Sequence, residues 1–166
     1  YDPDGQIELK VTPPKPLQSI TAKWGARDAN WFFDFPTSAQ KVISFLEASK
    51  IYQEQLINFD GALAINVPVI KTILEVTGPI ELRDYGFTVT SQNFLPTIQR
   101  EVEAGSDREA GEPKRILKIM APLLLQKLAL LDDIQKRTLL QGLKNHIVTK
   151  DIMLYFKDWE IENFLR

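Results

Sequence analysis

Four polar side chains that could bind an anion and a metal ion lie close together in the sequence. They are Arg27, Asp28, Asn30 and Asp34, within the stretch WGARDANWFFDFPTSAQ. Arginine presents a planar fork of donors that fits phosphate, whereas carboxylate and amide oxygens are ligands that Mg²⁺ prefers. We therefore expect Arg27 and Asn30 to bind phosphate, and Asp28 and Asp34 to hold a divalent cation, with Mg²⁺ as the expected cofactor.

A helix is expected directly after this cluster. Apolar residues recur at helical spacing from Ala39 to Leu46, and T-x-x-Q at Thr37–Gln40 has the form of a capping box. The helix should therefore begin at about Thr37. Backbone N–H groups and the dipole at a helix start favour an anion, so the cluster and the helix together predict a site for pyrophosphate and a metal ion.

The residue types alone favour a structural role for the same side chains, because structural ion-pair networks have the same sequence pattern. Arg27 would then pair with Asp28 or Asp34, and the other polar groups would hydrogen-bond the backbone of their own loop. The neighbouring aromatic residues leave a similar choice, between a wall that stacks on a ligand and packing onto the helix. We expect at least two of them to pack; the set is Trp24, Trp31, Phe32, Phe33 and Phe35.

The rest of the sequence holds no other recognisable catalytic motif. Glycine-rich phosphate loops, H-E-x-x-H and G-x-S-x-G are absent, and so is cysteine. The single histidine, His146, lies near the end of an apolar-faced helix, where it meets the negative end of the helix dipole. A structural role is favoured for His146, and no catalytic residue is assigned.

Composition indicates a folded protein without a strongly basic character. The 166 residues include 20 Lys and Arg against 22 Asp and Glu, a net charge of −2, which disfavours a nucleic-acid partner. The longest apolar run, from Ile119 to Leu131, is interrupted by Gln126 and Lys127. It is shorter than the about 20 residues that a membrane span needs, so we expect no transmembrane segment in this chain.

The order of the expected elements indicates a mixed α/β fold. Gly61–Ile65 is typical of a central strand buried on both faces, a helix follows from Asn66 to Gly78, and Ile80–Leu82 is the next strand. This order predicts a βαβ unit in a central mixed sheet, flanked by several helices, within a single domain over residues 1–166.

The other expected elements begin with an edge strand at 7–11, a helix at 90–104 that is kinked by Pro96, and a mobile polar loop at 105–113. Two helices that cover the sheet should follow, at 114–131 with a bend at Pro122 and at 133–146. A strand at 152–156 and a helix at 159–166 complete the chain.

Three stretches of the chain together resemble a known family. They are W-x-x-RDANW-x-x-DFPTSA from Trp24, DGALAINVPVIKTILEVTGPIEL from Asp60, and LYFKD from Leu154. In this order they resemble the bacterial domain-of-unknown-function family DUF4012, commonly regarded as a distant relative of the LytR-CpsA-Psr proteins. The resemblance covers nearly the whole chain and implies a LytR-CpsA-Psr-like fold.

LytR-CpsA-Psr proteins are membrane-anchored, face outward, and transfer anionic glycopolymers from a polyprenyl-pyrophosphate carrier to peptidoglycan. In them arginines hold the pyrophosphate and aspartates hold Mg²⁺, and the resemblance places Arg27 and Asn30 in the substrate-facing segment. The chain opens on YDPDGQ, without an initiator Met or a signal segment, and the relatives' upstream strands are absent. We expect a fragment of a longer protein that is anchored to the membrane upstream of it.

The resemblance therefore implies an extracytoplasmic cell-envelope domain with a phosphotransferase-like role on polyprenyl-pyrophosphate-linked glycopolymers. Its expected partner is a lipid-linked glycopolymer or another cell-wall polymer. The alternative is a non-catalytic envelope scaffold or binding module on the same fold, which the missing glycine-rich phosphate motif, the lone His146 and the absent upstream strand favour. Whether the chain is an enzyme stays open between these two.

Overall fold

The computed structural model describes residues 11–112 and 114–164, apart from the side chain of Arg27. Helices and short strands alternate along the chain, which confirms the mixed α/β class. The chain forms two compact units, one of residues 1–64 and 153–166 and the other of residues 65–152. The single domain expected over residues 1–166 stays a prediction.

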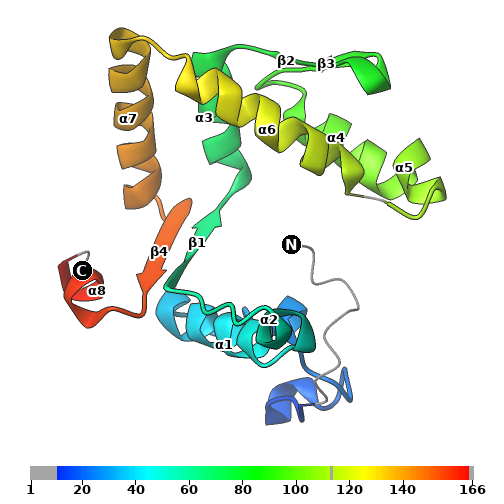
Figure 1. The fold of residues 1–166 in the computed structure, drawn as a ribbon, viewed down its shortest axis with the longest axis vertical. Coiled ribbons are helices and arrows are strands. Elements are labelled where there is room, and N and C mark those ends of the chain that lie inside the picture. Colours follow the sequence, from blue (N-terminus) through cyan, green and yellow to red (C-terminus); the bar gives the residue numbers. More distant parts are fainter. Residues whose placement is uncertain (1–10, 113, 165–166) are drawn as a thin grey trace. The chain divides into compact units, whose positions relative to one another are not determined.

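The first unit is mainly helical and holds most of one small sheet. Its elements are η1 (Lys15–Leu17), η2 (Ala26–Asp28), α1 (Phe35–Glu47), α2 (Lys50–Glu54), α8 (Trp159–Phe164) and most of β1 (Gly61–Ile65) and β4 (Ile152–Phe156). β1 and β4 pair with each other, as Figure 1 shows. Gly61 allows this close approach, because a Cβ atom at that position would clash with the carbonyl oxygen of Tyr155.

The second unit packs helices around a two-stranded hairpin. Its elements are α3 (Val67–Thr77), β2 (Ile80–Leu82), η3 (Arg83–Tyr85), β3 (Phe87–Val89), α4 (Phe94–Ala104), α5 (Ser106–Glu109), α6 (Arg115–Ala129) and α7 (Asp133–Val148). β2 and β3 are antiparallel, with Ile80 opposite Val89 and Leu82 opposite Phe87. Ile80, Leu82 and Val89 are at most 1% exposed, because they pack against the helices in one apolar cluster.

The central mixed sheet is not confirmed. The expected order of strand, helix and strand is present as β1, α3 and β2, yet β1 pairs with β4 and β2 pairs with β3. In the described ranges the strands therefore form two separate pairs. β1 is also not buried on both faces, since Leu63 is 58% exposed. The edge strand expected at 7–11 lies outside the described residues except for Val11, which forms an isolated antiparallel bridge with Trp24.

Several expected helices are confirmed with shifted ends. α3 ends at Gly78, which has the positive φ of 79° that favours glycine. α4 begins at Phe94, so Pro96 lies in the first turn, where its missing N–H costs no hydrogen bond within the helix and no kink is required. α6 continues across Pro122 as one helix. No helix in the described part of the chain is long and apolar enough to cross a membrane.

The polar stretch at 105–113 differs from the expected loop. It contains the short helix α5, and Asp107 in that helix is only 3% exposed. The hydroxyl of Tyr85 donates a hydrogen bond to one carboxylate oxygen of Asp107, and Nη1 of Arg115 lies 3.4 Å from the other. Burial and the bond to Asp107 raise the pKa of Tyr85. The Asp107 carboxylate therefore links η3, α5 and α6.

We expect Asp107→Ala to lower the free energy of unfolding by about 1–3 kcal/mol, because it leaves the part-buried hydroxyl of Tyr85 and the guanidinium of Arg115 without this acceptor. Urea unfolding would measure the change. Glu109→Ala, an exposed acidic residue of the same short helix, is the matched control. An equal loss in both variants would contradict the linking role of Asp107.

Candidate functional site

The first two of the four predicted site residues, Arg27 and Asp28, lie in η2. Two buried alanines, Ala26 and Ala29, determine which side of this 3-10 helix faces the core. A 3-10 helix repeats every three residues, so Ala26 and Ala29 lie on the same side, and both are buried at 6% and 0% exposure. Asp28 lies between the two alanines and Asn30 follows them, and both are exposed. The backbone thus presents the polar groups of Asp28 and Asn30 to solvent.

Trp24 fixes the position of η2 through a hydrogen bond to its backbone and ring contacts with α1. Its indole N–H donates to the carbonyl oxygen of Asp28 at 2.9 Å, and its ring meets Phe45 of α1 edge-on with centroids 5.2 Å apart. The ammonium of Lys41 lies 4.9 Å from the Trp24 ring centroid, a cation–π contact. Trp24 is 5% exposed. It is therefore a packing residue that joins the loop to α1.

Asp34 is the N-cap of α1. The helix therefore starts earlier in the sequence than the expected position, Thr37. Oδ1 of Asp34 accepts a hydrogen bond from the backbone N–H of Thr37 at 2.9 Å, as an N-cap does, and the helix runs from Phe35. Pro36 in the first turn is favourable, because its fixed φ suits a helix and its missing N–H has no helical partner there. One oxygen of the predicted metal ligand Asp34 thus has a structural partner.

Ser38 is a residue of this segment that the sequence did not single out. It is 1% exposed, and its hydroxyl donates to the carbonyl oxygen of Phe32 at 3.2 Å and lies 3.2 Å from the N–H of the same residue. This double contact folds the segment before Asp34 back onto α1. A small polar residue in the first turn of a helix is the sequence signal that could have indicated it.

The aromatic residues divide between packing and exposure. Trp24 is buried, and Phe35 packs against a second apolar cluster formed by Ala39, Ile43 and Tyr155, so at least two aromatics pack, as expected. Trp31 is 50% exposed and Phe33 is fully exposed. Phe32 is 37% exposed, so three aromatic side chains reach the surface beside Asn30 and Asp34.

The predicted phosphate and metal ligands share one short segment of the structure. Arg27 and Asp28 lie in η2, Asn30 follows it, and Asp34 caps α1. The side chain of Arg27 falls outside what is described, so its pairing with Asp28 or Asp34 stays a prediction. Among the described residues no three His, Asp or Glu side chains are grouped as a metal site, and the divalent cation stays a prediction as well.

His146 forms a network in the second unit that the sequence did not indicate. Asp151 accepts hydrogen bonds from Thr149 at 2.7 Å and from Asn66 at 3.3 Å, and Nδ1 of His146 lies 3.2 Å from it. A carboxylate only accepts, so Nδ1 carries the proton, and in the neutral ring Nε2 accepts from the hydroxyl of Thr72 at 2.8 Å. These bonds join α3, α7 and the segment before β4.

Thr72, His146 and Asp151 follow one another in the order hydroxyl, imidazole and carboxylate, as in the catalytic triad of a hydrolase. The backbone around Thr72, however, differs from that around a catalytic nucleophile. Thr72 lies inside α3, where the backbone N–H groups are bonded within the helix and none is left to stabilise an oxyanion. Gly142 of α7 lets the helices approach, since a Cβ there would lie 2.7 Å from Cγ2 of Thr72. The contacts of His146 are those of a structural tie between the two helices.

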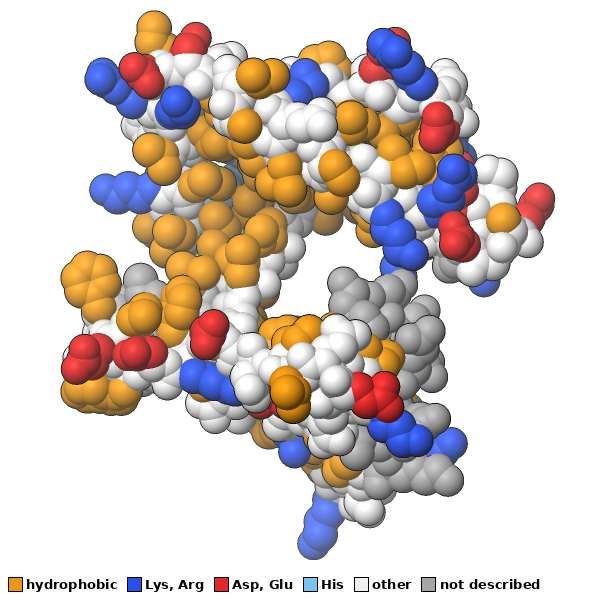
Figure 2. Space-filling model, in the orientation of Figure 1, with side chains coloured by type: hydrophobic (Ala, Val, Ile, Leu, Met, Phe, Trp, Pro, Cys, Tyr) orange, Lys and Arg blue, Asp and Glu red, His pale blue; other side chains and the backbone are white. Residues whose placement is uncertain are grey.

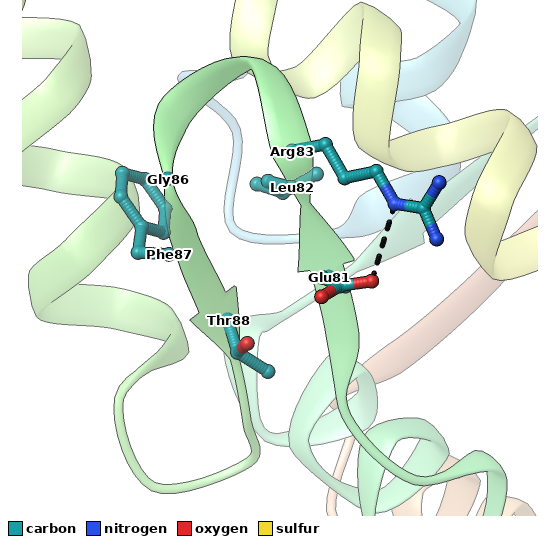
Figure 3. A pocket seen from close by; sticks show the side chains of 6 residues that line it. All are labelled: Glu81, Leu82, Arg83, Gly86, Phe87 and Thr88. Atoms are coloured by element: carbon teal, nitrogen blue, oxygen red, sulfur yellow. Dashed lines mark hydrogen bonds and ion pairs between the residues drawn. The ribbon is translucent and has the colours of Figure 1, made fainter.

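A shallow pocket lies on the β2–β3 hairpin. It is lined by Glu81, Leu82, Arg83, Gly86, Phe87 and Thr88, and Figure 3 shows the Arg83 side chain turned toward Glu81. Nε of Arg83 lies 3.3 Å from Oε2 of Glu81, and both side chains are well exposed. The charges that line this pocket are therefore already paired, and the ion pair is worth little at the surface.

We expect Asp34→Ala to lower the free energy of unfolding by about 1 kcal/mol, because the N–H of Thr37 loses its acceptor. Asp34→Asn keeps a good cap without the charge, so its stability should stay close to that of the parent chain. Urea unfolding of both variants checks this. Equal losses in Asp34→Ala and Asp34→Asn would show that the charge, and not the cap, stabilises α1.

The hydrogen bond from Thr149, followed by that from His146, lowers the pKa of Asp151. The stabilisation from Asp151 is therefore fully present above about pH 3.9, the unfolded value, and is lost as the pH falls through the lowered pKa of the folded state. Urea midpoints between about pH 5 and about pH 3 should fall more steeply for the parent chain than for Asp151→Asn. Parallel curves would contradict this role of Asp151.

The comparisons with known proteins identify a family. Residues 4–102 match the model of the family described as "Protein of unknown function (DUF4012)". No curated protein and no solved structure matched the chain. The matched range contains η2, α1, α3 and the β2–β3 hairpin and ends within α4. It spans more than half of the chain, which therefore belongs to the DUF4012 family of proteins of unknown function.

Proposed function

We propose that this chain is an extracytoplasmic domain of the cell envelope that binds the pyrophosphate of polyprenyl-linked glycopolymers and has a phosphotransferase-like role on them. The observation that supports the proposal is the placement of Asp28, Asn30 and Asp34, which are all exposed in the segment that leads into α1. That segment belongs to the range matched by the family. It combines hard oxygen ligands with the start of a helix, where an anion is favoured.

Each polar residue has a chemical role in this proposal. Arg27 binds a phosphate oxygen through its guanidinium, and Asn30 orients the group by hydrogen bonding. The exposed carboxylates of Asp28 and Asp34 are the donor type that fits a divalent cation such as Mg²⁺. The cation would neutralise charge on the transferring phosphoryl group when bound.

The proposal includes a LytR-CpsA-Psr-like arrangement with a central mixed sheet. The lipid carrier and an outward-facing location, with an anchor in the parent protein, belong to the same proposal. They rest on the likeness of the sequence to that relative.

A non-catalytic scaffold or binding module is the second candidate, and internal bonds of the segment favour it. Trp24 binds the carbonyl oxygen of Asp28, Ser38 binds Phe32, and Asp34 caps the helix. A loop held in this way presents a fixed surface without needing a ligand to order it. Such a module would bind a cell-wall polymer and would not catalyse transfer.

Isothermal titration of the chain with farnesyl pyrophosphate and Mg²⁺ tests the site. We expect Arg27→Ala to weaken binding by about tenfold or more, because a charge-assisted hydrogen bond to phosphate is lost. Lys23→Ala, which removes an exposed cation nearby in the sequence, is the control and should change the affinity little.

Two results of this titration would separate the candidates. Unchanged affinity in Arg27→Ala would overturn the assignment of Arg27 to phosphate. Pyrophosphate binding that depends on Arg27, without transfer of a phosphoryl group to any acceptor in a turnover assay, would favour the binding module over the phosphotransferase-like role.

A further inference from the structure

The outer side of α6 is unusually apolar for a surface. Its inner side packs into the core through Ile116, Met120 and Leu124. The exposed side carries Leu117 and Leu125, of which Leu125 is 65% exposed, together with exposed alanines. A helix that is apolar on both sides has a second apolar surface that the core does not use.

The neighbouring helix α7 adds exposed apolar residues. Leu130, in the turn before α7, is 84% exposed, and Ile134, Leu140 and Ile147 are between 54% and 77% exposed. In Figure 2 hydrophobic side chains cover much of α6 and α7 on the face turned to the viewer, and Lys and Arg side chains project beside α7. The outer surface of α6 is therefore largely apolar, whereas the exposed side chains of α7 combine apolar residues with cations and neutral polar groups.

Positive charge is concentrated in the same part of the chain. Residues 114–150 carry eight Lys and Arg against two Asp, although the whole chain has a net charge of −2. Lys118, Arg137 and Lys144 are exposed and have no acidic partner among the described residues. Three exposed cations without an acidic partner in the described ranges therefore lie on the helices that expose leucine.

The cations and the apolar side chains alternate along single helix faces. Lys136, Leu140, Lys144 and Ile147 follow one another at steps of four, four and three residues on α7, which places them on one side of the helix. On α6, Lys118 and Leu125 are seven residues apart and share a side in the same way. Apolar side chains and cations therefore share the outward side of each helix, where long lysine side chains can reach anionic headgroups while leucine and isoleucine contact the apolar boundary.

We propose that the outer surface of α6 and α7 docks onto the surface of an anionic lipid bilayer. The leucine and isoleucine side chains enter the boundary between headgroups and acyl chains, and Lys118, Arg137 and Lys144 meet the phosphate of anionic headgroups. A nucleic acid would use the cations but leave the exposed leucines in water. The lipid surface satisfies both features, and the proposal does not depend on a pyrophosphate site at Arg27.

Co-sedimentation of the 166-residue chain with lipid vesicles tests the proposal. We expect binding to vesicles that contain phosphatidylglycerol, weak binding to phosphatidylcholine alone, and a loss of affinity as salt rises from about 0.05 M to about 0.5 M. Lys118→Glu with Lys144→Glu should weaken binding by about tenfold or more. Leu125→Gln, an uncharged change at an exposed position, should weaken it as well.

The matched control is Lys15→Glu with Lys23→Glu, which makes the same change in net charge at exposed positions of the first unit. It should retain most of the binding. Equal binding to both kinds of vesicle, or an equal loss in the two double variants, would overturn the proposal. Binding to duplex DNA or formation of a dimer through this surface, without binding to vesicles, would also overturn it.

Discussion

The packing of the β2–β3 hairpin against α6 is the constraint on which the second unit depends. Leu82 and Val89 on the strands and Ile116 on the helix are at most 1% exposed, and they belong to one cluster that also includes α3, α4 and α7. Burying side chains of this size contributes about 1.5–3 kcal/mol each. An isolated two-stranded hairpin is marginally stable at best in water, so β2 and β3 depend on α6, which covers one of their faces.

This packing also decides which side of α6 remains free. Because Ile116, Met120 and Leu124 pack against the hairpin and the helices beside it, the opposite side of α6 must face outward. That side still carries leucine and alanine, where a surface helix ordinarily carries polar residues. The exposed apolar surface follows from the sequence of α6 and from the position of the core.

Local elements could be predicted from the sequence, but their pairing could not. The strand at Gly61–Ile65, the helix that ends at Gly78 and the strand at Ile152–Phe156 all follow from short-range patterns, and the structure confirms them. The pairing of β1 with β4 joins residues about ninety positions apart, and no local pattern encodes it. The burial of Asp107 likewise depends on Tyr85, which lies 22 residues away.

The start of α1 shows how a stronger local rule overrides a weaker one. The T-x-x-Q pattern favoured Thr37, but Asp34 followed two residues later by Pro36 satisfies both the cap and the first turn of a helix. The same reasoning applies to the two alanines of η2, whose spacing of three residues could have predicted which side of the RDAN segment is buried. For Asp28 and Asn30 the sequence therefore held enough information to predict exposure, whereas their chemistry depends on a ligand.

Net charge conceals how charge is distributed along this chain. A value of −2 excludes a uniformly basic surface, yet the basic residues are concentrated in 114–150 and the rest of the chain is correspondingly acidic. Electrostatic attraction depends on the local field within about one Debye length, roughly 8–10 Å, and not on the total charge. The α6–α7 segment can therefore attract an anionic surface while the remainder of the chain is repelled by it, which would orient the second unit on that surface.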